Sequence, residues 1–177
     1  MITRKPFAAA AVAGSFALLL AACSNPPPPR PTPERTSPTP TAMVEAIRAA
    51  GVDDKSVVQI APLRDPAVDG YLDRAHADEN AGNYPAALSK IDAALKLSPD
   101  APDILQFRAE VEILLRNDPA AEADARRSFL LGPKVGALCA RNWQTILEIA
   151  QADHRAADVT TAREALAKCQ KAGPVRM

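Results

Sequence analysis

Few residues of this 177-residue chain have the types and spacings that catalysis or metal binding requires. The chain has three cysteines and two histidines, and His76 and His154 are far apart in the sequence. Gly-x-Ser-x-Gly, His-Glu-x-x-His and a glycine-rich phosphate loop are all missing from it. The acidic residues are spread over what read as solvated helix faces, so none pairs as a general acid with a general base. We therefore expect no enzyme, no catalytic residue, no metal, no cofactor and no small-molecule substrate.

The first 22 residues predict export. Arg4 and Lys5 precede an uncharged, mostly apolar run from 7 to 22. That run is shorter than the roughly 20 residues a membrane-spanning helix needs. A basic start, a short apolar run and small residues at its end are the layout of a secretory signal peptide. Residues 1–22 are therefore expected to be a signal peptide.

The run ends in Leu20-Ala21-Ala22-Cys23, which resembles the lipobox of bacterial lipoproteins. In that family the chain is cut before the cysteine. Its sulfur carries a diacylglyceryl group and its amino group an acyl chain such as palmitate. The resemblance implies that Cys23 is the lipid attachment site, and several acyl chains make membrane release very slow. The residue after Cys23 is Ser24. An Asp at that position would retain the protein at the inner membrane, so Ser24 implies a location in the inner leaflet of the outer membrane, facing the periplasm. The alternative is an ordinary signal followed by a fortuitous cysteine.

A proline-rich stretch follows the cysteine. Eight prolines lie between Pro26 and Pro40, and this composition favours an extended polyproline II chain over a packed core. We expect residues 23–41 to be a lipid-anchored linker; the alternative is a ligand for a proline-binding module. Without residues 1–22 the chain has 19 basic and 21 acidic residues, so the basic footprint of a nucleic-acid-binding protein is lacking.

The remainder repeats with a period of 34 residues. Pro99 and Pro133 are 34 residues apart, and each follows a similar series of small residues. Three units, 68–101, 102–135 and 143–176, each read as two amphipathic helices joined by a turn. The small residues of the three units are Ala75, Ala87 and Ala94; Ala109, Ala121, Ala125 and Ser128; and Ala150, Ala162 and Cys169.

This pattern resembles the tetratricopeptide repeat (TPR), a family of 34-residue helical hairpins with small residues where the helices touch. The resemblance implies an all-α fold, a TPR-like α-solenoid of about three units over residues 68–177. Residues between the second and third units would extend the next helix by two turns, from about Gly136.

The segment 42–67 is expected to be a short helix followed by an extended lead-in. Residues 41–50 predict a helix that ends at Gly51. The β-branched and apolar residues 56–61 would pack along the repeat helices as an extended strip. Asp65 and Pro66 then predict the cap and first residue of the next helix.

Two charged pairs stand where the TPR family usually has leucine and tyrosine. These are Arg74 with Asp78 and, one unit later, Arg108 with Glu112. The i, i+4 spacing predicts an ion pair on one helix face. The alternative is that these charges are reserved for a partner.

Cys139 and Cys169 remain once Cys23 carries lipid. Cys139 falls early in one predicted helix and Cys169 late in the next, and an antiparallel hairpin brings such ends together. The compartment beyond the inner membrane is oxidising. We expect a disulfide; the alternative is two separate small apolar residues in the core. A redox-active role is not expected, because Cys-x-x-Cys is absent.

In the TPR family the first helix of each unit lines a concave groove that binds proteins or peptides. The resemblance implies the same role here, and its apolar, acidic and amide lining favours a neutral or basic guest with apolar anchors. The alternative is that these residues face solvent or are covered by the chain's own residues 56–64. The groove positions are Asp69, Leu72, His76, Glu79 and Asn80; Asp103, Gln106, Glu110, Ile113 and Leu114; and Gln144, Leu147, Gln151, His154 and Arg155.

Together these features predict a non-enzymatic periplasmic lipoprotein that acts as an adaptor or assembly factor by binding an envelope protein or peptide. Lipid anchoring would raise its local concentration at the membrane. Two alternatives remain: a structural module that self-associates, and an accessory subunit of a cell-envelope enzyme complex.

Overall fold

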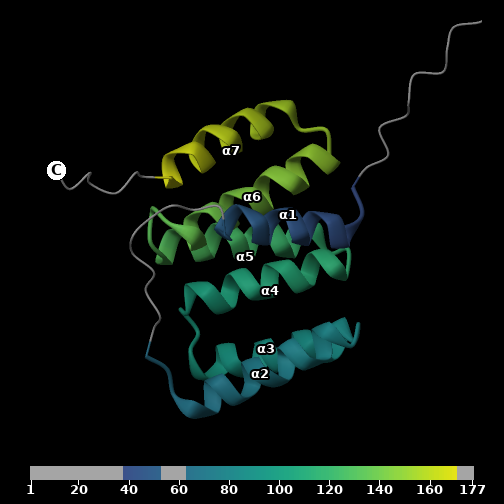
Figure 1. Ribbon diagram of the computed structural model, residues 1–177, viewed down its shortest axis with the longest axis vertical. Coiled ribbons are helices and arrows are strands. Elements are labelled where there is room, and N and C mark those ends of the chain that lie inside the picture. Colours follow the sequence, from purple (N-terminus) through teal and green to yellow (C-terminus); the bar gives the residue numbers. More distant parts are fainter. Residues whose placement is uncertain (1–37, 53–62, 171–177) are drawn as a thin grey trace, which may run out of the picture. The chain divides into compact units, whose positions relative to one another are not determined.

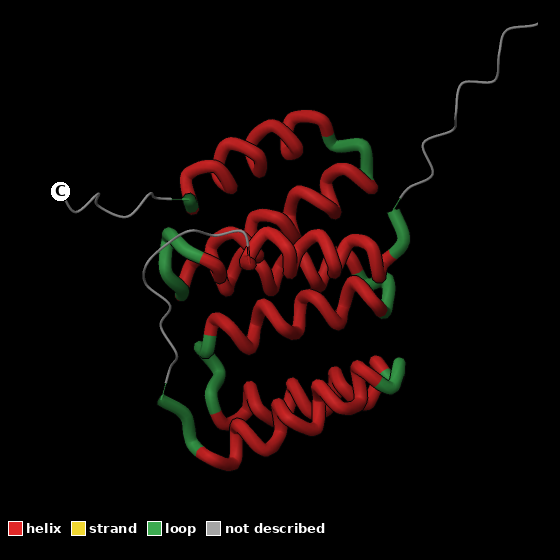
Figure 2. Tube along the Cα trace, in the orientation of Figure 1, coloured by secondary structure: helices red, strands yellow, loops and turns green. Residues whose placement is uncertain are grey.

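A computed structural model describes residues 38–52 and 63–170, and all of its regular structure is α-helical, with no strand among these residues (Figure 1, Figure 2). This confirms the all-α prediction. None of the helices in these ranges is long and apolar enough to cross a membrane. The helices are α1 (Pro40–Val52), α2 (Pro66–Asn80), α3 (Tyr84–Leu97), α4 (Pro102–Leu114), α5 (Asp118–Leu131), α6 (Ala137–Ala152) and α7 (Ala156–Cys169).

Several predictions fall outside the described residues. These are the signal peptide 1–22, the lipid attachment site Cys23, most of the linker 23–41 and the strip 56–61. The helix expected over 41–50 is present as α1, which begins at Pro40 and ends at Val52, so it includes Gly51.

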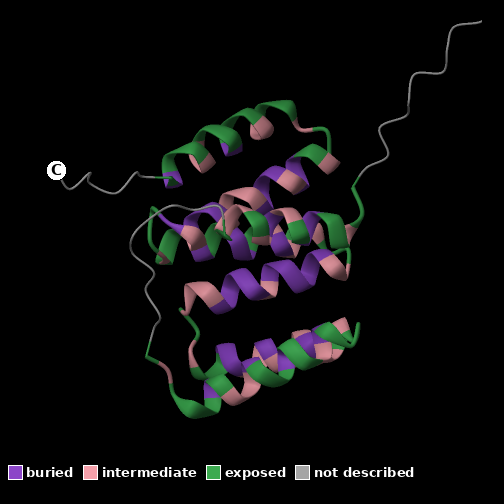
Figure 3. Ribbon diagram, in the orientation of Figure 1, coloured by how far each residue is buried: buried purple, intermediate pink, exposed green. Residues whose placement is uncertain are grey.

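Helices α2 to α7 form three hairpins, α2 with α3, α4 with α5, and α6 with α7 (Figure 1). The hairpins stack in chain order, because α4 also packs on α3 and α6 on α5. This is the TPR-like packing predicted from the repeat. The small residues predicted at the helix contacts are all buried, and small side chains let helix axes approach closely. The fully buried ones are Ala75, Ala87, Ala94, Ala109, Ala121, Ala125, Ser128, Ala150, Ala162 and Cys169 (Figure 3).

Proline positions set several helix starts. Each helix from α2 to α5 has a proline in its first turn, where the missing N–H costs no hydrogen bond. At the start of α2 the Asp65 carboxylate accepts a hydrogen bond from the Ala67 N–H at 2.8 Å, as expected of a cap.

The turn inside each hairpin has the same geometry, with one residue in the left-handed region: Gly82 (φ 75°), Arg116 (φ 59°) and His154 (φ 57°). Arg116 follows Gly82 by 34 residues, but His154 follows Arg116 by 38. The turn of the third hairpin therefore comes three residues earlier than the predicted bounds 143–176 imply. The predicted extension of its first helix is present, since α6 begins at Ala137 directly after Gly136. In each turn the residue after the left-handed one donates to the carbonyl five residues before it: Asn83 to Asp78, Asn117 to Glu112 and Arg155 to Ala150.

A disulfide joins Cys139, in the first turn of α6, to Cys169, the last residue of α7. Their Cα atoms are 5.6 Å apart. The Gly136 N–H also donates to the Cys169 carbonyl at 3.0 Å. The predicted bridge is thus present and ties the open end of the last hairpin.

Candidate partner-binding face

Helix α1 has no hairpin partner in the described chain. It lies against α4 and α6 (Figure 1). Its Arg48 side chain reaches Glu79 on α2. We call the surface that α2, α4 and α6 present to α1 the first-helix face. Met43, Val44 and Ile47 of α1 are buried there. They share one apolar cluster with residues of α4 and α6, among them Ile113, Ile146, Leu147 and Ile149.

Gly51 lets the end of α1 lie close to the start of α6. A Cβ atom at Gly51 would come within 2.9 Å of the Arg141 side chain and 3.5 Å of the Ala137 carbonyl oxygen. The last turn of α1 therefore faces the first turns of α6, so the two helices run in opposite directions (Figure 1).

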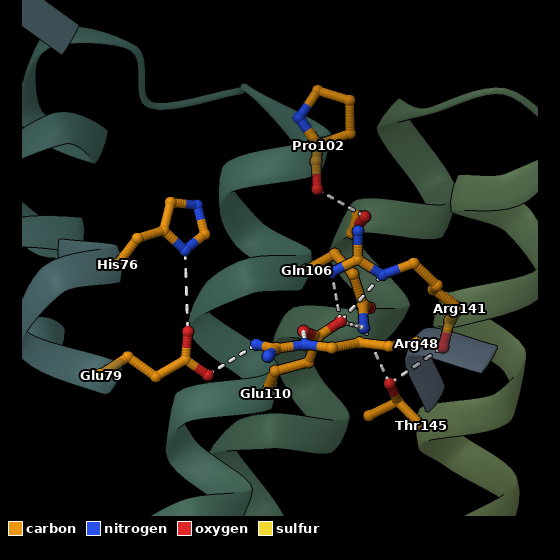
Figure 4. Close-up of polar contacts among 9 residues, drawn as sticks. Arg48, His76, Glu79, Pro102, Gln106, Glu110, Arg141 and Thr145 are labelled. Atoms are coloured by element: carbon orange, nitrogen blue, oxygen red, sulfur yellow. Dashed lines mark hydrogen bonds and ion pairs between the residues drawn. The ribbon is translucent and has the colours of Figure 1, made fainter. Parts of the chain in front are cut away.

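A fully buried carboxylate, Glu110 on α4, lies at the centre of this face (Figure 4). The Nε of Arg48 donates to its Oε2 at 2.9 Å, and the Nε of Arg141 donates to its Oε1 at 2.9 Å. The Gln106 amide donates to Glu110 Oε1 at 3.0 Å and to the Thr145 hydroxyl at 2.9 Å. A buried charge is tolerated when it is paired and hydrogen-bonded. Here α1 supplies one of the two arginines and α6 supplies the other.

A second buried carboxylate, Glu79 on α2, also binds α1. It accepts from Arg48 Nη2 at 2.6 Å, and its other oxygen lies 3.6 Å from His76 Nδ1 (Figure 4). Burial acts to raise the pKa of Glu79, but the nearby His76 ring and the hydrogen bond from Arg48 outweigh it and hold that pKa below its usual value. Burial likewise opposes the charge of Arg48, yet Glu110 and Glu79 together raise the pKa of that guanidinium. The His76 ring stacks on Phe107, with ring centroids 4.1 Å apart.

The fifteen residues predicted to line the groove fall into three groups. The buried ones are Leu72, Glu79, Gln106, Glu110, Ile113 and Leu147. The exposed ones are Asp69, His76, Asn80, Gln151 and His154. The half-buried ones are Asp103, Leu114, Gln144 and Arg155.

The buried group is not available as an open groove. Gln106 and Glu110 belong to the polar cluster that binds Arg48, while Ile113 and Leu147 belong to the apolar core shared with α1. In the described chain, α1 therefore covers part of the predicted groove, whereas the alternative named residues 56–64, most of which lie outside the described residues. The described residues of that segment are Leu63, which is exposed, and Arg64, which forms an ion pair with Asp103.

Arg155 does not belong to the face. It is the residue before α7, and its guanidinium donates to Glu122 of α5 at 2.6 Å and to Asp158 of α7 at 2.5 Å. Counting the third unit from residue 140 instead places Arg141 at a groove position. The structure agrees, because Arg141 binds Glu110.

Two residues of the cluster, Arg48 and Arg141, were missed at the sequence level. The left-handed turn at His154 sets the register that identifies Arg141, and its φ angle is visible only in the structure. Arg48 lies beside Ile47 on the buried side of a short amphipathic helix, but nothing in the sequence says where that helix docks. Among the described residues, no group of three or more His, Cys, Asp or Glu side chains is placed to hold a metal ion.

The fold and this face define a TPR-like stack of helical hairpins with an additional helix docked on the first-helix face. Among solved structures, the chain is similar to the globular C-terminal domain of LpoP from P. aeruginosa. The TM-score is 0.53 at 24% sequence identity, and the match covers 62% of this chain and 100% of that one. This likeness concerns the fold. No protein-family model and no curated protein sequence matches the chain.

Proposed function

We propose that this chain is a non-enzymatic lipoprotein, anchored through Cys23 in the inner leaflet of the outer membrane and facing the periplasm. It would act as an adaptor or assembly factor by binding an envelope protein on the first-helix face. One observation carries the proposal: this face already holds a helix, α1, and buries three apolar side chains and one arginine-carboxylate cluster beneath it.

The part of the face beside α1 offers exposed polar groups to a partner. Asp69, His76 and Asn80 of α2 are exposed, and they lie on the helix whose Glu79 binds Arg48. At the other end of the stack, Gln151 and His154 are exposed near the end of α6. A partner segment with basic or neutral polar groups would complement these carboxylate, amide and imidazole groups.

A photo-activatable cross-linking residue in place of Asn80 tests the proposal in intact cells. We expect irradiation to join the chain to one envelope protein, identified by mass spectrometry. The matched control carries the same residue in place of Ala123, which is exposed on α5, a second helix of a hairpin. Equal capture from both positions, or capture of cytoplasmic proteins only, would refute binding on the first-helix face.

A further inference from the structure

Helix α1 is attached to the rest of the described chain differently from the other helices. Each of α2 to α7 packs against a hairpin partner and a stacked neighbour, except at the two ends of the stack. α1 packs on the first-helix face through Met43, Val44, Ile47 and Arg48, and its Ala50 packs against the cluster around the Cys139–Cys169 disulfide. Because α1 belongs to none of the three hairpins, it can leave the face while the hairpins keep their own contacts.

The charges beneath α1 are arranged for a cation that comes from outside the hairpins. Without α1, the two buried carboxylates Glu79 and Glu110 would face a single arginine, Arg141. Arg48 restores the balance by binding both carboxylates at once. The face therefore recognises a helix that carries an arginine, as well as apolar side chains.

The sequence of α1 shows which pattern the face accepts. Met43 and Val44 are followed four positions later by Ile47 and Arg48, so large apolar residues at i, i+1 and i+4 and an arginine at i+5 lie on one side. With α1 in place, Leu114 of the same apolar cluster stays partly exposed. A longer or bulkier helix would find apolar surface that α1 leaves uncovered.

We propose that the first-helix face is a helix-binding site, that α1 is its resident ligand within the chain, and that the partner presents an amphipathic helix with this apolar-and-arginine pattern and displaces α1. This inference rests on the proposed function, because it names the partner of the same face. It also makes α1 a regulator: the stronger its docking, the weaker the partner's apparent binding.

A labelled peptide with the sequence of residues 38–52 serves as the probe, and the purified full-length chain in detergent is the receptor. The substitution Ile47→Asp places a charge where a fully buried side chain packs, so it weakens the docking of α1 on the face. We expect this variant to bind the peptide at least tenfold more tightly than the wild-type chain. A peptide with Arg48→Glu should bind the variant at least tenfold more weakly. The matched control, Ala49→Asp, places the same charge on an exposed position of α1 and should bind like the wild type.

Hydrogen exchange on the wild-type chain gives a second test that does not depend on the variant folding. We expect the amides of α1 to exchange at least tenfold faster than those of α4 and α6, because α1 leaves without global unfolding. Equal protection of all three helices would overturn the proposal. So would an Ile47→Asp chain of wild-type helicity that does not bind the peptide, or a wild-type chain that exchanges α1 with a second copy and forms dimers.

These tests separate this inference from the proposed function. If Asn80 captures an envelope protein but the peptide does not bind, the helix-binding site is refuted and the adaptor function stands. If the peptide binds but no envelope protein is captured at Asn80, the helix-binding site stands and the adaptor function is refuted.

Discussion

Arg108 shows how packing changes the partner that sequence spacing suggests. The i, i+4 rule predicted a pair with Glu112, but Arg108 binds Asp124 of α5 at 2.6 Å and Asp92 of α3 at 3.2 Å. Glu112 instead accepts from the Asn117 side chain at 2.8 Å. The rule describes an isolated helix, whereas stacked hairpins bring carboxylates from both neighbouring helices within reach of one guanidinium. Arg108 therefore joins two hairpins, and it is not reserved for a partner's charge.

Replacing Asp124 with Ala should destabilise the stack. The Arg108–Asp124 contact has two donors, and the Asp124 side chain is only 10% exposed, so its loss leaves a half-buried guanidinium short of acceptors. We expect the free energy of unfolding in urea to fall by about 1–3 kcal/mol. Asp100→Ala is the control, because it removes an exposed pair with Arg127 and should change stability by at most about 0.5 kcal/mol. Equal effects of the two variants would contradict a joining role for Arg108.

Glu79 makes the stability of the α1 contact depend on pH. Its pKa is lowered in the folded chain, so the unfolded chain binds the proton more readily and acidification favours unfolding. Its contribution is complete above the ordinary glutamate value of about 4.3 and is lost as the pH falls through the lower folded value. We expect the difference in unfolding free energy between wild type and Glu79→Gln to be largest near about pH 7 and to shrink below about pH 4.

Urea unfolding of both chains over a pH series measures this difference. Burial raises the pKa of Glu148, so the contribution of Glu148 to stability changes with pH in the direction opposite to that of Glu79. Glu148 is present in both wild type and Glu79→Gln, so its effect cancels in the difference. A difference that does not vary with pH would mean that His76 and Arg48 do not stabilise the ionised carboxylate.

At the scale of the helices, the sequence was sufficient for the hairpins but not for their register. Alanines such as Ala109 and Ala121 mark contacts that recur with the 34-residue period, and the structure buries them as predicted. In the third unit the turn comes three residues earlier than the predicted bounds imply. A shift of three residues is nearly one helical turn and keeps side chains on nearly the same face. The small residues Ala150, Ala162 and Cys169 are therefore buried as predicted, and the position of the turn is visible only in the φ angle of His154.

Docking of α1 could not be predicted, for a different reason. Its amphipathic pattern shows that one side is buried but does not identify the surface that buries it. The contact joins Arg48 to Glu110 across 62 residues of sequence, and no local rule describes such a pair.

The equivalence of the three turns predicts opposite effects of two substitutions. Gly82→Ala should lower the free energy of unfolding by about 1 kcal/mol, because an L-residue is disfavoured at φ 75° although the space around its Cβ is open. Arg116→Gly should raise it by about 0.5–1 kcal/mol, because Arg116 already occupies the left-handed region. Urea unfolding measures both effects.

The control for this pair is Ala81→Gly. Ala81 has ordinary right-handed dihedral angles, so glycine there should lower stability by about 0.5–1 kcal/mol. If glycine were destabilising at both Ala81 and Arg116, the three turns would not be energetically equivalent.

At the scale of the whole chain, one surface serves both packing and proposed binding. On the first-helix face the hairpins bury two carboxylates, Glu79 and Glu110, although apolar side chains in their place would pack as well. These charges make the face selective for a helix that supplies an arginine, a property that apolar packing alone does not give. The chain would thus bring to the membrane a site whose occupancy depends on competition between α1 and a partner.

Membrane attachment is the last requirement of this arrangement, and it depends on Cys23, which lies outside the described residues. We expect Cys23→Ala to abolish labelling of the chain by a fatty-acid analogue in cells and to leave the chain unprocessed or soluble. The control is Cys139→Ser, since Cys139 pairs with Cys169 and its loss should leave lipid labelling intact while breaking the disulfide. Labelling that persists in Cys23→Ala would refute the anchor. The hairpins and the helix-binding face would stand, but without a mechanism for concentrating them at the membrane.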